Sequence, residues 1–340
     1  MSEETPHRRR PRYSGKNPRR FDQKYKELAG HPDTIARVIA SGKTPAGTHV
    51  PIMVDEILEV LAPREGETAV DCTLGFGGHT RRLLQRIAPG GHLIGLDADP
   101  VEIAKTESAL RAEGWSPEVF TARKSNFAGL HAALAAAGRT GVDLILADLG
   151  VSSMQLDNPA RGFTWKSAGP LDMRMNPARG ISATQWLLKI SPSALEEALV
   201  ENADEPDARL LATALAGKNF ETTTELASAI RQALPMRSTE LADKAIRRVF
   251  QAIRISVNEE FTALDALLRT LPACLNAAGR VAILTFHSGE DRRVKKAFQA
   301  GFREGVFDLI SAEVIRPSIN ECRANPRATS AKLRWARKAR

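Results

Sequence analysis

A glycine-rich turn between residues 68 and 97 carries the residue types that hold a nucleotide-like ligand. A short apolar run predicts a strand that ends at Val70, and apolar residues then recur at helical spacing from Thr80 to Ile87. The turn between them contains Gly75, Gly77 and Gly78. Glycine adopts positive φ without steric cost and lets backbone N–H groups approach a ligand. Asp97 ends the next apolar run, where a carboxylate can accept hydrogen bonds from both hydroxyls of a ribose. Together these features predict a nucleotide-type binding corner.

A second carboxylate beside the turn indicates the class of ligand. A dinucleotide places its pyrophosphate on the helix N-terminus, usually with G-x-G-x-x-G spacing. In this chain Gly77 and Gly78 are adjacent, and Asp71 stands at the end of the strand. A carboxylate there would repel a pyrophosphate but can pair with an ammonium group. The pattern therefore favours S-adenosylmethionine, which carries a sulfonium and an ammonium but no phosphate.

Two further titratable residues come directly after apolar runs. Asp148 closes the run D-L-I-L-A-D, and His287 follows R-V-A-I-L-T-F. At the end of a strand in a doubly wound sheet, such a side chain faces the reactive end of a bound cofactor. Each residue also has a plain structural interpretation, Asp148 as the cap of the following turn and His287 as a hydrogen-bonded histidine. The pattern leaves both interpretations open.

The order of the surrounding elements predicts an α/β fold with a doubly wound, Rossmann-like sheet. Strands are predicted at Thr68–Cys72, His92–Leu96, Glu118–Thr121 and Val142–Ala147, and helices at Thr80–Ile87, Pro100–Ala112 and Phe127–Ala137. This alternation is typical of parallel sheets, whose ligands bind beyond the carboxyl ends of the strands. We therefore expect Asp71, Asp97, Asn126 and Asp148 to face one crevice.

The alternation stops after the fourth strand, and residues 153–244 are predicted to form an inserted helical domain that recognises the substrate. Capping boxes are predicted at Ser182/Gln185, Ser193/Glu196 and Thr222/Glu225, and Gly217 as the stop after a helix at Asp207–Ala216. The insertion begins with an irregular stretch over residues 153–180. Its arginines and aromatic residues can either stack on an unpaired base and hold its phosphates, or form a packed loop between domains: Arg161, Phe163, Trp165, Arg174 and Arg179.

The sheet domain is predicted to be discontinuous, with segments at 48–152 and 245–340. Apolar residues every three or four positions from Ile246 to Leu271 predict one long helix or a broken pair. Arg280–Phe286 is predicted as a buried strand, H-S-G-E-D as the start of a helix, and Phe307–Ile315 as the region of a last strand.

Charge is concentrated at the two ends of the 340-residue chain. Residues 1–26 carry a net charge of +6 and residues 323–340 a net charge of +7, which leaves −5 for residues 27–322. Basic ends are typical of arms that bind a polyanion such as RNA, although they can also be merely solvated. We expect residues 1–47 to be a basic, disordered extension with a short helix near 33–41, and the last residues to form a basic tail.

Composition excludes several other classes of protein. No apolar run approaches the roughly 20 residues that span a bilayer. The three cysteines, Cys72, Cys274 and Cys322, are scattered and lack the spacing of metal ligands. We therefore expect a cytoplasmic protein without a metal site.

Eight motifs along residues 48–335 give the chain a specific resemblance. They are H-V-P-I-M-V-D-E-I-L, D-C-T-L-G-F-G-G-H-T, A-D-L-G-V-S-S-M-Q-L-D, R-G-F-T-W, P-L-D-M-R-M, F-Q-A-I-R-I-S-V-N-E-E, F-H-S-G-E-D and N-P-R-A-T-S-A-K-L-R. The chain resembles the bacterial 16S ribosomal RNA cytosine N4-methyltransferases, the RsmH/MraW group. The resemblance implies an S-adenosylmethionine-dependent enzyme that acts on a decoding-centre cytosine of small-subunit RNA.

The resemblance also implies the cofactor-binding positions: Gly77, Gly78 and His79 in the turn, Asp97 on the ribose, Phe127 by the adenine, Asp148 and Gln155. Four departures from the group's pattern bear on how the substrate is positioned. The N-terminal arm is longer than usual, Gly289 replaces a leucine, Ala168 stands where an acid is common, and Thr329 replaces a basic residue.

The expected chemistry needs an acceptor for the amine of cytosine, whose nitrogen lone pair is delocalised into the ring. Asp148 or nearby backbone carbonyls are candidates, with Asp172 and His287 as weaker ones, and the sequence does not choose among them. No metal is needed, because the positive sulfur already activates the methyl group. Two other classes remain, an NAD-dependent dehydrogenase and a non-catalytic RNA-binding module, and cofactor titration would distinguish both from a methyltransferase.

Overall fold

The computed structural model describes residues 51–152, 155–156 and 158–340, which belong to one compact unit. The predicted basic arm, with its short helix near 33–41, lies outside the described residues. No helix in the described part of the chain is both long and apolar enough to cross a membrane.

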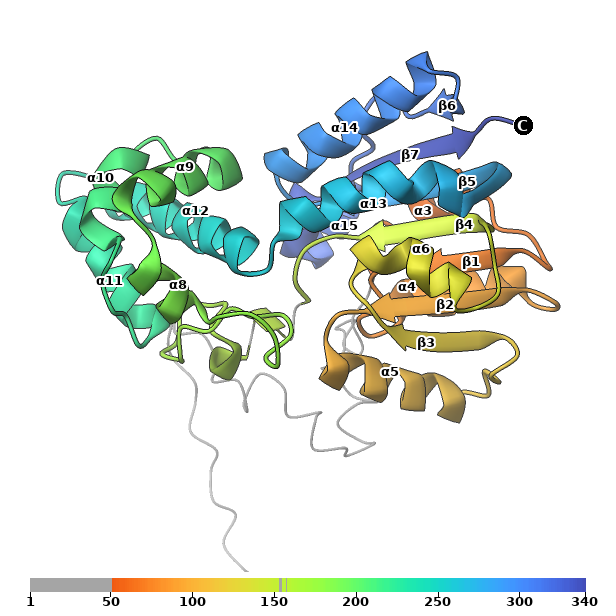
Figure 1. The fold of residues 1–340 in the computed structure, drawn as a ribbon, viewed down its shortest axis with the longest axis horizontal. Coiled ribbons are helices and arrows are strands. Elements are labelled where there is room, and N and C mark those ends of the chain that lie inside the picture. The colour runs from red at the N-terminus through yellow and green to blue at the C-terminus, as the bar shows by residue number, and fades with distance from the viewer. Residues whose placement is uncertain (1–50, 153–154, 157) are drawn as a thin grey trace, which may run out of the picture. The chain divides into compact units, whose positions relative to one another are not determined.

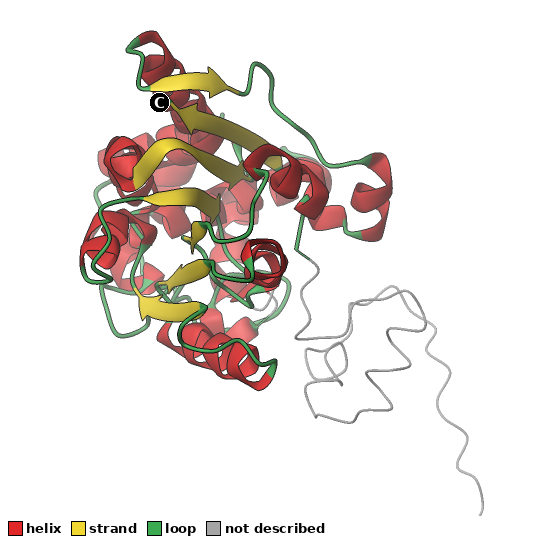
Figure 2. Cartoon of the chain, turned by 90° about the vertical axis from the view of Figure 1, so that its right-hand side faces the viewer, coloured by secondary structure: helices red, strands yellow, loops and turns green. Residues whose placement is uncertain are grey.

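A seven-stranded sheet forms the centre of the described chain, in the order β3-β2-β1-β4-β5-β7-β6 (Figures 1 and 2). Its strands are β1 (Thr68–Asp71), β2 (His92–Asp97), β3 (Phe120–Lys124), β4 (Val142–Asp148), β5 (Leu275–Thr285), β6 (Phe307–Ile310) and β7 (Lys332–Lys338). Strands β1 to β5 pair in parallel, and β7 pairs antiparallel with both β5 and β6. The strand order reverses direction at β1, so the predicted doubly wound α/β fold is confirmed. β3 begins two residues later than predicted.

Helices cover both faces of this sheet, because successive strand residues alternate between the faces. In β4, Leu144 and Leu146 face the helices α3 (Val54–Leu61), α4 (Gly78–Ile87) and α5 (Pro100–Ala112). Ile145 and Ala147 face the opposite layer. That layer contains η2 (Phe127–Gly129), α6 (Leu130–Ala135), α13 (Glu260–Cys274) and α14 (Ser288–Arg303). A strand buried on both faces explains the continuous apolar sequence of β4.

The helices after β4 bury a hydrophobic core of their own. They are α8 (Ala183–Lys189), α9 (Pro192–Ala203), α10 (Ala208–Leu215), α11 (Thr223–Ala233) and α12 (Thr239–Val257). This core includes Val249, Phe250 and Ile253 of α12, so α12 packs with the helices that precede it. The predicted periodic segment from Ile246 to Leu271 is a broken pair of helices. The break lies at Glu259, which has a left-handed φ of 52°.

Two of the three predicted capping boxes are confirmed, at Ser182/Gln185 and Thr222/Glu225. The box at Ser193/Glu196 is wrong, because α9 begins with Pro192 and its N-cap is Ser191, whose hydroxyl accepts from the Ala194 N–H. Proline at the first helical position has its φ already set for a helix, which moves the start of α9 forward. Gly217, with φ 72°, follows α10 as predicted.

The prediction of a basic C-terminal tail is wrong. After the short α15 (Ile319–Ala324) and η4 (Pro326–Ser330), the chain forms β7 between β5 and β6. Arg334 is buried and donates from Nε to Asp291 at 2.6 Å, and Arg337 pairs with Asp308 at 2.8 Å. The charge count missed this strand because its cations neutralise carboxylates within the fold.

We expect Arg334→Ala to lower the free energy of unfolding by about 3–5 kcal/mol, because it leaves the Asp291 carboxylate without its partner at a largely buried position. Urea unfolding of both proteins measures this difference. Arg340→Ala, at the exposed chain end, is the control and should stay within about 0.5 kcal/mol of the parent protein. An equally small effect for both variants would contradict the assigned role of Arg334.

Candidate functional site

A cavity of about 360 Å³ lies at the carboxyl ends of the parallel strands. Most of the predicted site residues line it: Gly78, His79, Asp97, Phe127, Asp148, Gln155 and His287. Asn126 lines it as well. These residues come from segments more than 200 positions apart in the sequence. The parallel register brings them together because each follows the end of a strand.

Asp97 stands at the end of β2 and is fixed by the glycine turn. Its Oδ2 accepts from the Gly75 N–H at 2.8 Å, and its Oδ1 accepts from the Asp99 N–H at 2.8 Å. Each carboxylate oxygen keeps a second lone pair for a ligand. Burial raises the pKa of Asp97 to about 6, although both backbone hydrogen bonds lower it. The charge of this carboxylate therefore depends on pH close to neutrality.

Asp148 stands at the end of β4 opposite a histidine. His79 Nδ1 lies 3.6 Å from Asp148 Oδ2, and His79 Nε2 lies 2.9 Å from the carbonyl oxygen of Ile52. A carbonyl oxygen only accepts, so Nε2 carries the hydrogen, and Nδ1 of a neutral ring turns its lone pair toward the carboxylate. Burial raises the pKa of Asp148 to about 6, although His79 lowers it. A proton between His79 Nδ1 and Asp148 Oδ2 would remove the repulsion between the ring lone pair and the carboxylate.

Three predicted residues are not brought to the cavity. Asp71 does not line it, because its carboxylate is buried and accepts from Thr80 Oγ1 at 2.7 Å. The expected pairing of Asp71 with a ligand ammonium is therefore not available. Asp172 also lies outside the lining and forms a bidentate pair with Arg174, at 2.8 and 2.7 Å. Although burial raises the pKa of Asp172, the hydrogen bonds from Arg174 lower it overall.

Gly77 is the third predicted residue outside the cavity lining, and its role is to form the turn before α4. It is the N-cap of α4 with φ 68°, and an added Cβ would lie 2.9 Å from the Cγ2 of Thr106 on α5. Glycine is needed here for the backbone conformation and for the approach of α5. Gly78, the next residue, is the one that lines the cavity.

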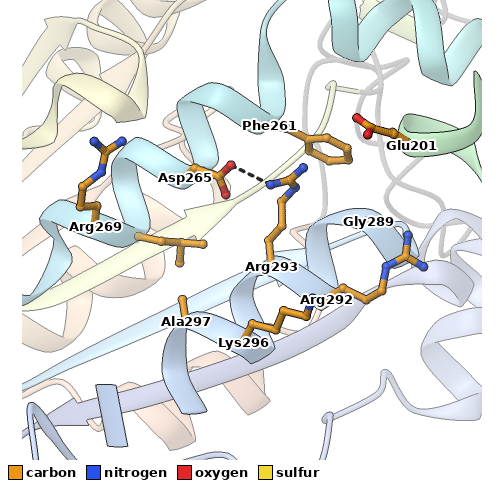
Figure 3. A pocket seen from close by; sticks show the side chains of 10 residues that line it. Glu201, Phe261, Asp265, Arg269, Gly289, Arg292, Arg293, Lys296 and Ala297 are labelled. Atoms are coloured by element: carbon orange, nitrogen blue, oxygen red, sulfur yellow. Dashed lines mark hydrogen bonds and ion pairs between the residues drawn. The ribbon is translucent and has the colours of Figure 1, made fainter. Parts of the chain in front are cut away.

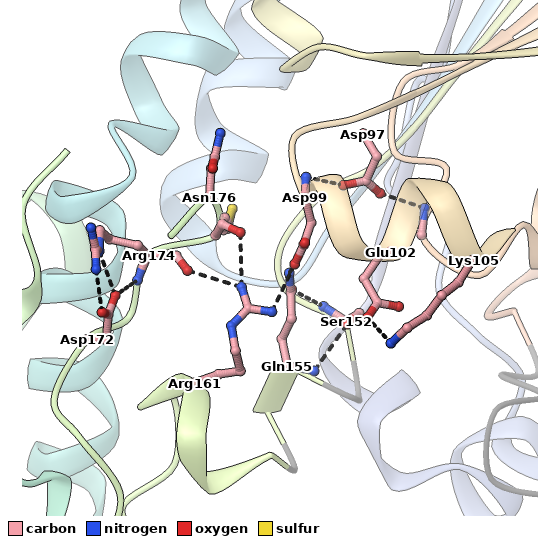
Figure 4. A network of polar contacts seen from close by, with 12 residues as sticks. Asp97, Asp99, Glu102, Lys105, Ser152, Gln155, Arg161, Asp172, Arg174 and Asn176 are labelled. Carbon is pink, nitrogen blue, oxygen red and sulfur yellow. Dashed lines mark hydrogen bonds and ion pairs between the residues drawn. The ribbon is translucent and has the colours of Figure 1, made fainter. Parts of the chain in front are cut away.

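A polar network joins the Asp97 side of the cavity to the irregular stretch (Figure 4). Asp99 is buried, and its Oδ2 accepts from Arg161 NH1 at 2.9 Å and from Gln155 Nε2 at 3.2 Å. Arg161 NH2 also donates to the carbonyl oxygens of Arg174 and Met175, at 3.1 and 2.9 Å. Arg161 therefore cross-links this stretch to the β2–α5 turn. Residues 153–180 were interpreted either as a base-stacking segment or as a packed loop, and the contacts of Arg161 fit the packed loop.

The cavity has a second wall that sequence reasoning missed. Gln251 and Arg254 reach it from α12, and Arg327 and Ser330 reach it from η4. Arg254 forms a bidentate pair with Glu260 at 2.8 and 3.0 Å. The motifs F-Q-A-I-R and N-P-R-A-T-S contain these residues, but nothing in their spacing indicated that they face the glycine turn.

Buried polar atoms without partners mark two points of the cavity wall. Both ring nitrogens of His287 lack a hydrogen-bond partner among the described residues, although Nε2 lies 3.2 Å from Glu290 Oε1. Glu102 Oε2 is likewise buried and unpartnered within that part of the chain. Buried polar groups are almost always hydrogen-bonded in native proteins. Nδ1 of His287 and Oε2 of Glu102 are therefore available to a ligand.

The chain matches known proteins along nearly its whole length. The chain matches the MraW methylase family over residues 46–339. Ribosomal RNA small subunit methyltransferase H 1 of Agathobacter rectalis is 47% identical over 350 residues, covering 100% of both chains. Ribosomal RNA small subunit methyltransferase H 2 of Alkaliphilus metalliredigens is 48% identical over 343 residues, covering 97% of each chain.

We expect Asp148→Asn to stabilise the ligand-free protein above pH 6. The pKa of Asp148 is about 6 in the fold and near 3.9 in an unfolded chain, so the folded state resists ionisation between these values. The gain should be absent below about pH 4, grow between pH 4 and 6, and reach about 1–3 kcal/mol above pH 6. Urea unfolding at pH 4 and pH 7.5 measures it. If Asp148→Asn were less stable than the parent protein at pH 7.5, the ionised Asp148 carboxylate would not be unfavourable in the folded state.

Proposed function

Because the chain belongs to the MraW methylase family, we propose that it N4-methylates a cytidine of 16S ribosomal RNA in the decoding centre of the small subunit. Methylation of small-subunit ribosomal RNA is the activity named for relatives that match its full length. S-adenosylmethionine is the cofactor, and the reaction belongs to the cytoplasm, where ribosomes are assembled. One observation supports the proposal: a single cavity combines the Asp97 and Asp148 carboxylates with residues of the helical insertion.

The residues of the cavity fit S-adenosylmethionine. A volume of about 360 Å³ lies within the usual range for small-molecule sites, about 300–1,000 Å³. Asp97 retains lone pairs for two ribose hydroxyls, and Phe127 offers an apolar ring for the adenine. Asp97 and Asp148 end strands on either side of β1, about 10 Å apart at the usual strand spacing. When bound, the cofactor supplies a methyl group that its sulfonium already activates.

Asp148 is the proposed acceptor for the cytosine amine. A carboxylate near the amine orients its N–H bonds and takes the proton that the nitrogen must lose. A pKa of about 6 suits a base that works near neutrality. His79 Nδ1 can accept that proton in turn, since its Nε2 hydrogen is held by the Ile52 carbonyl.

The second wall, together with His287, is the proposed binding surface for the flipped base. A base inside an RNA helix cannot reach a closed cavity, so it must be unstacked first. Gln251, Arg254 and His287 can then meet the hydrogen-bonding edge of the cytosine. Asp172 has no part in this proposal, because Arg174 occupies both of its oxygens.

We expect Asp97→Ala to weaken binding of S-adenosylmethionine at least about tenfold, because two hydroxyls lose a charged acceptor worth about 1.5–3 kcal/mol for each hydrogen bond. Calorimetry on the folded variant measures the affinity. Glu107→Ala, on the exposed side of α5, is the control and should leave the affinity unchanged. Equal affinities for the Asp97 variant and the control would refute the ribose assignment.

Nucleoside mapping of ribosomal RNA tests the proposed target. Deletion of the gene should abolish one N4-methylated cytidine of 16S RNA, and the parent gene should restore it. Asp148→Asn should fail to restore it, whereas Asp243→Asn, at a half-buried position on α12 outside the cavity, should succeed. A deletion strain with an unchanged set of N4-methylated cytidines would refute the proposed function.

A further inference from the structure

A second hollow, a groove of about 490 Å³, lies outside the cofactor cavity, between α13, α14 and the end of α9 (Figure 3). We call it the α13–α14 groove. Four cationic side chains line it, Arg269, Arg292, Arg293 and Lys296, against the two carboxylates Glu201 and Asp265. The cations stand out because residues 27–322 carry a net charge of −5.

Two of the four cationic side chains have no carboxylate partner among the residues that the structure describes. Arg292 pairs with Asp204 at 3.2 Å, and Arg293 pairs with Asp265 at 2.7 Å. Lys296 and Arg269 are exposed and form no ion pair with any residue that the structure describes. A cation held at the wall of a groove without a carboxylate partner favours an anionic ligand.

One aromatic ring separates the groove from the cofactor cavity. The Phe261 ring lies 5.6 Å from the ring of His287, which lines the cavity. The Arg293 guanidinium lies 4.3 Å from the centre of the same Phe261 ring. The groove therefore begins where the cavity ends, on the side of the proposed base-binding wall.

Gly289 makes this arrangement possible. A Cβ at residue 289 would lie 2.6 Å from Cζ of Phe261, closer than side chains approach. The ring of Phe261 thus occupies the space that a side chain at residue 289 would fill. Gly289 itself lines the groove. Glycine at this position, a departure from the pattern of the group, sets the shape of the head of the groove.

We propose that the α13–α14 groove binds the phosphodiester backbone of the RNA nucleotides beside the target cytidine. The inference rests on the proposed function and adds a binding site to it. Along α14, Lys296 lies seven residues after Gly289, a rise of about 10 Å, so the groove leads away from the cavity by more than one helical turn. A flipped base in the cavity would leave its neighbouring phosphates at the head of the groove, beside Arg293, with Lys296 farther along.

A charge-reversal pair on α14 tests the inference. Lys296→Glu should weaken binding of protein-free 16S RNA, taken from cells that lack the gene, about tenfold. It should also reduce the slope of log K against log salt by about 0.7–0.9. Lys295→Glu makes the same charge change at the next residue, which is exposed but does not line the groove, and should weaken binding less than about twofold. Both variants should bind S-adenosylmethionine like the parent protein.

Three results would overturn the inference. Equal losses for the two variants would mean that only overall charge matters. No loss for Lys296→Glu would mean that the groove does not hold RNA. A loss seen with assembled small subunits but not with protein-free RNA would assign the groove to a protein partner. The nucleoside map made with the parent protein judges the proposed function separately, because it does not depend on Lys296.

Discussion

The pairing of β1 with β2 on one side and β4 on the other is the constraint on which the site depends. It places Asp97 and Asp148 at one edge of the sheet, where burial raises the pKa of each to about 6. Neither carboxylate has a cationic Lys or Arg partner among the described residues, although the imidazole of His79 lies beside Asp148. The fold thus buries two carboxylates at the edge of the sheet where the proposed function places the cationic cofactor and the amine substrate. Stability is traded for function here, which is common at active sites.

Hydrogen bonds connect the helical insertion to the sheet near Asp97. Asp97 accepts from the Asp99 N–H, and the Asp99 side chain accepts from Arg161. On the opposite wall, Asn258 bonds the backbone of Met173 and Met175 at the junction of α12 and α13. Asp97, the proposed ribose acceptor, is therefore two hydrogen bonds away from the irregular stretch.

Sequence patterns predicted the parts of the fold that depend on local periodicity and strand ends. The glycine turn, the parallel strands and most of the cavity residues follow from apolar runs and the residue that ends each run. The predicted positions of Asp71 and Asp172 at the cavity were wrong because their carboxylates bond to nearby residues, Thr80 and Arg174. Sequence spacing does not indicate whether a carboxylate bonds to a neighbour or faces a ligand. β7 was missed because its four cations, like those of the residues before it, are typical of a solvated tail. Gln251 and Arg254 were missed because the packing of α12, rather than its sequence, turns them to the cavity.

We propose that Asp148 acts as the base for the cytosine amine. The most direct test is the pH dependence of single-turnover methyl transfer with the cofactor saturating. With Asp148 as the base, the rate constant should rise about tenfold per pH unit below pH 6 and level off above it. Asp148→Asn should be slow at every pH, with cofactor affinity little changed. A flat profile for the parent protein between pH 5 and 7, or the same rising profile in Asp148→Asn, would contradict the claim.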